Sequence, residues 1–75
     1  MDTQVVKTFL EVALTGSFGH AASRLNVGQT TVSARIRKLE EQLGQTLFDR
    51  RKSGAELTLA GRQFLRLAPS FVQLG

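Results

Sequence analysis

Apolar residues recur at helical spacing in the first part of the chain. In residues 3–14 they occupy positions i, i+3, i+4 and i+7: Val6, Phe9, Leu10 and Ala13. This spacing places them on one face of a helix. Gly16 follows Thr15 and can adopt the left-handed conformation that ends many helices. The pattern predicts an amphipathic helix over 3–14 with one face packed against a core.

The second apolar pattern is shorter and contains two alanines. Residues 18–25 repeat the same spacing: Phe18, Ala21, Ala22 and Leu25. Ser17 precedes them and is of the residue type that caps helix N-termini. A short helix is therefore predicted over 18–25. Residues 26–28 then form a predicted tight turn, in which Val27 is available to the core.

A third helix is predicted from Gln29 to Leu43. Its apolar stripe consists of Val32, Ile36, Leu39 and Leu43, and Gly44 is placed to end it. Two helices joined by three residues match the description of a helix-turn-helix. Because amphipathic helix pairs are common in small α-helical domains, the elements that follow decide the fold.

A β-hairpin and a fourth helix are predicted after the third helix. Residues 47–50 and 56–58 are short, partly alternating segments, and the polar segment 51–55 between them contains a glycine. Thr58 can cap a helix from about residue 59, where Pro69 is expected to kink or interrupt it. Its apolar face is Phe64, Leu67, Ala68 and Phe71. The order predicts a mainly α fold: a winged helix-turn-helix with a three-helix core, a two-stranded wing and a further helix.

Length and composition exclude several classes of protein. The 75 residues form one small domain, and the absence of cysteine excludes disulfides, thiolate zinc sites and a thiol nucleophile. His20 is the single histidine, so neither a metal site nor a cofactor is expected. No apolar run approaches the roughly 20 residues of a membrane span. The N-terminal residues 1–4 lack the basic start of a signal peptide, which favours a cytoplasmic protein.

The charge is basic and clustered. Ten Lys and Arg against six Asp and Glu give a net charge of +4 and a pI near 10.8. Six of the ten cations form two clusters: Arg35, Arg37 and Lys38, and then Arg50, Arg51 and Lys52. Clustered cations suit the phosphates of a nucleic acid or an anionic membrane. A lightly basic, solvated surface accounts for the charge alone equally well.

The exposed side of the third helix carries chemistry suited to DNA. Its N-terminal polar face offers Gln29, Thr30, Ser33 and Ala34 to base edges, where amides, hydroxyls and methyl groups discriminate bases. Arg35, Arg37 and Lys38 suit phosphates, and so do the wing residues Arg50, Arg51, Lys52 and Ser53, one of which could enter a minor groove. Glu40 lies nearer the apolar stripe, and an ion pair with a nearby cation is expected for it.

Each of these features also fits a less specific role. A polar helix start follows from capping and propensity alone, and a charged turn also keeps a surface soluble. A protein-interaction module that binds an acidic partner is the second hypothesis. An enzyme has no support, because no nucleophile, acid–base pair or glycine-rich phosphate loop is present at motif spacing.

Three segments resemble the DNA-binding domain of LysR-type transcriptional regulators: residues 18–40, 43–50 and 57–61. The resemblance implies a winged helix-turn-helix over 1–58 and the start of a linker helix over 59–75, through which two subunits dimerise by Phe64, Leu67, Ala68 and Phe71. It implies groove or phosphate contacts from Gln29, Thr30, Thr31, Ser33, Ala34, Arg35 and Arg37, and wing contacts near residues 50–53.

The resemblance also sets expectations for partners. It implies a homodimer on the pseudo-palindromic operator of a bacterial regulator, and a small-molecule effector bound only by a C-terminal domain that this chain is expected to lack. Three positions depart from the family pattern. Gly28 and Ser53 stand where serine and arginine are frequent, and Ala34 stands where a polar or basic residue is frequent.

Overall fold

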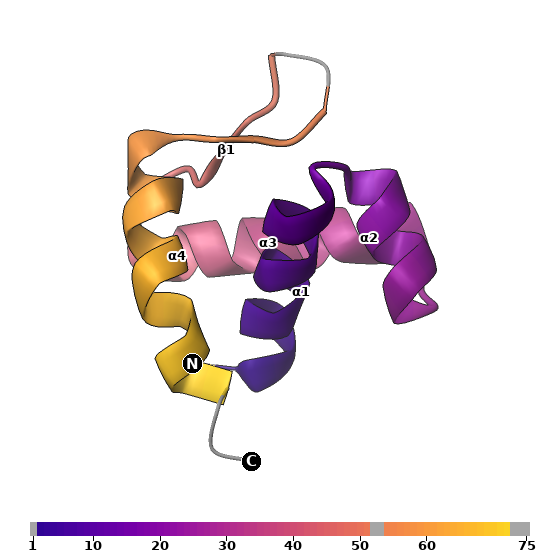
Figure 1. Ribbon diagram of the computed structural model, residues 1–75, viewed down its shortest axis with the longest axis horizontal. Helices are drawn as coiled ribbons and strands as arrows, with labels where there is room; N and C mark the ends of the chain where they lie inside the picture. The colour runs from indigo at the N-terminus through magenta and orange to yellow at the C-terminus, as the bar shows by residue number, and fades with distance from the viewer. Residues whose placement is uncertain (1, 52–53, 73–75) are drawn as a thin grey trace.

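The computed structural model describes residues 2–51 and 54–72. Its elements follow the predicted order: α1 (Thr3–Thr15), α2 (Phe18–Leu25), α3 (Gln29–Leu43), β1 (Phe48–Asp49), β2 (Glu56–Leu57) and α4 (Leu59–Val72). Helices α1 and α4 pack side by side with α3 crossing behind them, and the hairpin stands at the end where α4 begins (Figure 1). The predicted winged helix-turn-helix architecture is confirmed.

Local capping interactions set the helix ends. Ser17 Oγ accepts a hydrogen bond from the His20 N–H at 3.1 Å, which fixes the start of α2. Gly16 and Gly44 follow α1 and α3 with φ of 70° and 72°, the left-handed conformation that glycine adopts without strain. Asn26 ends α2 in the same conformation, with φ of 59°. The predicted bounds of α2 and α3 are confirmed, and α1 runs one residue further than predicted.

The core is centred on aromatic rings from three elements. Phe9 of α1 is fully buried, with ring centroids 5.4 Å from Phe48 of β1 and 5.1 Å from Phe64 of α4. Edge-to-face and tilted pairs at this spacing stabilise beyond simple area burial. Phe18 of α2 extends the cluster to Phe48 at 5.7 Å. The core therefore ties the wing directly to α1, α2 and α4.

The buried face of α1 is rotated from the predicted one. Val5, Thr8 and Val12 are buried together with Val6 and Phe9, while Leu10 and Ala13 are only half-buried. Thr8 tolerates burial because its hydroxyl donates to the Gln4 carbonyl one turn earlier, at 2.8 Å. The sequence pattern favoured an all-apolar face, whereas the fold buries a face that contains a satisfied hydroxyl.

The wing is a minimal antiparallel pair. Phe48 pairs with Leu57 and Asp49 with Glu56, so both strands are shorter than the predicted segments. Thr58 joins the hairpin to α4: its hydroxyl donates to the Thr46 carbonyl at 2.7 Å and accepts from the Gly61 N–H at 3.0 Å. The predicted capping role of Thr58 is confirmed.

Helix α4 passes through its proline. A kink or an interruption is predicted at Pro69; the interruption is wrong, because the helix continues to Val72. The proline ring holds φ near −65°, which is itself helical, and only the bond to the carbonyl four residues earlier is lost. On this helix Phe64 and Ala68 are buried, whereas Leu67 and Phe71 are 58% and 43% exposed.

Candidate nucleic-acid interface

The first turns of α3 present a small polar surface to solvent. Gln29, Thr30, Thr31 and Ala34 are exposed and Ser33 is half-buried, as the sequence pattern required for contact with base edges. The opposite side of the helix holds it to the core through Val32, Ile36 and Leu39, all fully buried. Gly28 has an extended backbone and no side chain to accept from the first amide groups. The Thr31 N–H donates to the Gly28 carbonyl at 3.1 Å. Because no side chain caps α3, the N–H groups that precede it in the helix are available to an external acceptor.

The cations of α3 divide into two kinds. Arg37 and Lys38 are exposed. Arg35 is half-buried, and its Nη1 donates to Thr8 Oγ1 of α1 at 3.4 Å. A phosphate contact from Arg35 stays a prediction, but this side chain also bridges α1 and α3.

The two wing cations that the structure describes are both paired with carboxylates. Arg51 is 88% exposed in its side chain and bonds to Asp49 at 3.0 Å, and this hydrogen bond, with the charge of Asp49, raises the pKa of Arg51. Arg50 lies 3.3 Å from Glu40 Oε1, and its guanidinium carbon lies 5.4 Å from the centre of the Phe18 ring. The predicted contacts of Lys52 and Ser53 lie outside the described residues.

Glu40 ties α3 to the wing. The ion pair predicted for it is confirmed, with Arg50 as the partner. Its second oxygen, Oε2, accepts from the Leu47 N–H at 2.8 Å, a bond that sequence reasoning missed. The only available signal was a glutamate beside the apolar stripe, shortly before the Gly44 turn. Because Glu40 is 8% exposed, both bonds compensate for the removal of its charge from water.

A hollow opens where α2, α3 and the wing meet. We call it the α2–α3–wing hollow; it is lined by Ser17, Phe18 and Gly19 of α2, Gln29 and Ser33 of α3, and Arg50 and Gly54 of the wing. A second hollow also has Arg50 in its lining, together with Arg37 and Thr46 among others. Arg50 therefore shares one hollow with the polar start of α3 and another with the exposed cation Arg37. This surface offers donors for base edges and cations for phosphates together.

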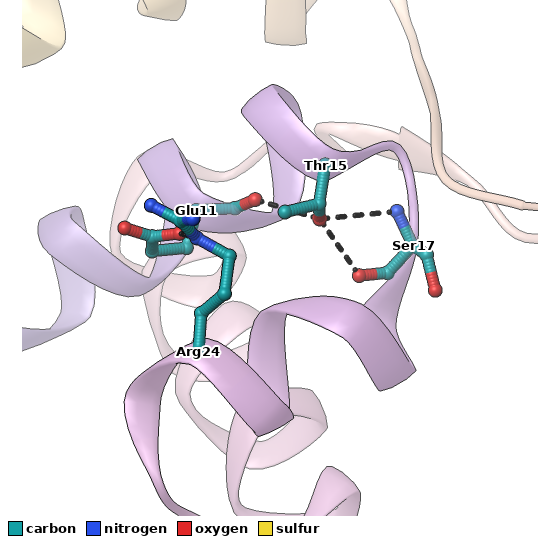
Figure 2. Close-up of polar contacts among 4 residues, drawn as sticks. All are labelled: Glu11, Thr15, Ser17 and Arg24. Carbon is teal, nitrogen blue, oxygen red and sulfur yellow. Dashed lines mark hydrogen bonds and ion pairs between the residues drawn. The ribbon is translucent and has the colours of Figure 1, made fainter.

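The corner between α1 and α2 fixes one wall of this surface. Figure 2 shows Glu11 of α1 paired with Arg24 of α2, and Thr15 Oγ1 bonded to both Glu11 and Ser17. The hydrogen bond from Arg24 to Glu11, aided by the carboxylate charge, raises the pKa of Arg24. The corner also reaches the wing, since the Gly16 carbonyl accepts from the Ala55 N–H at 3.0 Å. This hydrogen bond thus connects the turn before α2 to the residue that precedes β2.

The residues predicted for dimerisation differ in their exposure to solvent. Phe64 and Ala68 belong to the core of the chain, so the structure favours a core role for them. Leu67 and Phe71 are exposed, and Leu67 edges an apolar hollow with Leu43, Leu47 and Ala60. Dimerisation through the four residues stays a prediction, and Leu67 and Phe71 are the two of them whose side chains are exposed.

Membrane spans and metal clusters are both absent from residues 2–51 and 54–72. None of the helices described there is long and apolar enough to cross a membrane. In the same residues, no group of three or more histidine, aspartate or glutamate side chains could hold a metal ion.

Comparison with known proteins gives consistent matches along the chain. The family model of bacterial regulatory helix-turn-helix proteins of the lysR family matches residues 3–62. The HTH-type transcriptional regulator HdfR of Salmonella typhimurium is 49% identical over 72 residues, which cover 96% of this chain and 26% of that protein. The HdfR protein of Salmonella agona gives the same values. The chain thus spans about a quarter of the length of these curated relatives.

Solved structures match with high geometric agreement. The CbnR DNA-binding domain in its DNA complex superposes with a TM-score of 0.92 at 38% identity, covering 99% of this chain and 85% of that one. The BenM DNA-binding domain with benA site 1 DNA gives 0.89 at 31% identity, covering 95% and 80%. DarR of Vibrio fischeri in complex with DNA gives 0.90 at 35% identity, covering 95% and 24%.

Proposed function

The chain belongs to the lysR family of bacterial regulatory helix-turn-helix proteins, and from this premise we propose that it is the sequence-specific DNA-binding domain of a transcriptional regulator. Helix α3 enters the major groove, and the wing meets the adjacent backbone or minor groove. The observation that carries this proposal is the exposed polar start of α3 beside the cations Arg37 and Arg50. The similar CbnR and BenM domains are complexes with DNA, which supports the same partner here.

Different parts of the surface have different tasks in this proposal. Base edges are contacted by the first turns of α3: Gln29, Thr30, Thr31, Ser33 and Ala34. Phosphates are contacted by Arg37, Lys38, Arg50 and Arg51, with Arg35, Lys52 and Ser53 as further candidates. Phosphate contacts set orientation and general affinity, whereas base contacts select the sequence. The proposal therefore separates the residues that determine specificity from those that determine affinity.

We also propose how the protein assembles and in which cellular compartment it acts. Two chains bind a pseudo-palindromic operator as a homodimer, and the exposed Leu67 and Phe71 of α4 contribute apolar contacts between them. The segment around α4 acts as the start of a linker helix. A small-molecule effector binds to a part of such a regulator other than the DNA-binding domain. A bacterial regulator meets its operator in the cytoplasm, where we place this chain.

Affinity for a random-sequence DNA duplex at several salt concentrations tests DNA binding. We expect log affinity to fall linearly with log salt, by about 0.9 per phosphate contact. Arg37→Ala should reduce the steepness of that slope by about 0.9, the contribution of one phosphate contact. The charge-matched control is Arg66→Ala, which removes an exposed cation from α4 and should leave the slope near that of the original chain. A flat salt response of the original chain would contradict the proposed function.

A further inference from the structure

The contacts of Arg50 point to a preformed phosphate-binding side chain. We propose that Glu40 and Phe18 are positioning residues that hold the guanidinium of Arg50 at the α2–α3–wing hollow before DNA arrives. This inference rests on the proposed function, because it assigns Arg50 to a phosphate of the bound duplex. It adds that a buried acidic residue on α3 strengthens binding to a polyanion.

Glu40 is a fixed acceptor. Its carboxylate is almost fully buried, and Oε2 is already bonded to the Leu47 N–H at 2.8 Å. That bond sets the orientation of the carboxyl group, so Oε1 faces Arg50 at 3.3 Å. A carboxylate held in this way constrains the cation more strongly than a mobile surface partner would, since it loses little freedom on pairing.

Phe18 supports the same guanidinium from a second element. The Arg50 guanidinium carbon lies 5.4 Å from the Phe18 ring centre, within the range of a cation–π contact. Phe18 is itself fixed by an edge-to-face contact with Phe48, whose ring centre lies 5.7 Å away. Arg50 is therefore held between α3 and α2, which confines a side chain that would otherwise sample many rotamers.

The restrained guanidinium is still able to bind a phosphate. A guanidinium has five N–H donors in a planar fork, so the bond to Glu40 does not exhaust it. The Arg50 side chain remains 37% exposed and lines both the α2–α3–wing hollow and the hollow that contains Arg37. A donor group ordered in advance binds with a smaller loss of entropy. Glu40 and Phe18 thus act on DNA through Arg50 and do not contact it themselves.

A double-mutant cycle on the random-sequence duplex tests this inference. Arg50→Gln should weaken binding about fivefold to tenfold at 0.1 M salt and remove about one contact from the salt slope. Glu40→Gln keeps an acceptor for the Leu47 N–H, and we expect it to weaken binding about threefold. The matched control is Glu41→Gln, the same charge change at the neighbouring exposed position, which should strengthen binding slightly because it removes a repulsive charge.

Dependence on Arg50 separates positioning from a general loss of structure. In the Arg50→Gln background, Glu40→Gln should no longer weaken binding, since its effect passes through the missing guanidinium. Phe18→Leu provides a second test that leaves the buried carboxylate intact; it should weaken binding about twofold alone and have no effect when combined with Arg50→Gln. Thermal melting of each variant verifies that it is folded.

The outcomes distinguish the two proposals. One outcome is that the original chain binds DNA with the expected salt slope while Glu40→Gln strengthens binding as Glu41→Gln does. In that case Glu40 only competes with DNA for Arg50, and the positioning role is overturned. An equal effect of Glu40→Gln or Phe18→Leu with and without Arg50 also overturns it. A chain that fails to bind DNA contradicts the proposed function itself, and the positioning of Arg50 for DNA fails with it.

Discussion

A single missing side chain sets how closely α4 approaches the wing. A Cβ added at Gly61 would lie 2.1 Å from the Leu47 carbonyl oxygen and 2.9 Å from Leu57 Cδ2, so the backbone would have to move. We expect Gly61→Ala to lower the free energy of unfolding by about 2 kcal/mol or more, as overpacking of a tight interior does. Urea denaturation of the purified chain measures this change.

Gly19→Ala is the control for that prediction. A Cβ at Gly19 would meet Gln29 Oε1 at 3.5 Å, an ordinary contact, and the position lies in α2. Alanine is a better helix former than glycine, so this variant should be up to about 1 kcal/mol more stable. Equal effects of the two substitutions would mean that the approach of α4 to Leu47 is not tight.

The burial of two polar side chains could not be predicted from the sequence. Thr8 and Glu40 are both buried, and each is accepted because of a partner that hydropathy does not reveal: the Gln4 carbonyl for Thr8, and Leu47 with Arg50 for Glu40. A helical pattern assigns apolar residues to the core but cannot weigh such partners. The predicted face of α1 was rotated for this reason.

The helices could be predicted because their signals are local. Apolar spacing and the end residues of helices are contained in a few neighbouring residues. Ser17 marks the start of α2, Gly44 the end of α3 and Thr58 the start of α4. The strands depend on pairing between distant residues, and only two pairs formed. Likewise, the exposed face of α3 could be predicted from periodicity. The contacts of Arg50 with Glu40 and Phe18 could not, because they depend on how α2, α3 and the wing pack together.

Helix α3 should divide into a part that selects the sequence and a part that anchors. Gln29→Ala should reduce discrimination between the preferred operator and a single-base variant by about 1–3 kcal/mol, because an exposed amide at the helix start would lose its base partner. Arg37→Ala should instead weaken both duplexes alike. Competition binding with the two duplexes measures both effects, and similar discrimination by Gln29→Ala and the original chain would contradict the division.

The exposed apolar residues of α4 bear on how chains associate. Leu67 is 58% exposed on a helix whose Phe64 and Ala68 are buried in the core. We expect Leu67→Asp to shift sedimentation toward the monomer, since a charge would be buried in the interface. Leu14→Asp is the control: Leu14 is 72% exposed on α1, and the same change there should leave association unaltered. A loss of dimer in both variants would argue against an α4 interface.

The number of α3 helices in each chain relates sequence recognition to the assembly of two chains. Each chain carries one α3, and half-sites on one face of a duplex lie roughly 34–36 Å apart. One chain can therefore place one α3 in one major groove, and a second chain is needed for the next half-site. In the proposed homodimer, sequence preference and assembly are linked in this way, because the operator should mirror the two-fold symmetry of the two chains.

Selection of bound sequences from a random DNA pool is the sharpest test of sequence-specific binding by this domain. The chain is immobilised, retained duplexes are amplified over several rounds, and the enriched sequences are determined at fixed salt. We expect a motif of two inverted half-sites whose centres lie about one helical turn, ~10 base pairs, apart. Retained sequences that remain as random as the starting pool would contradict sequence-specific recognition.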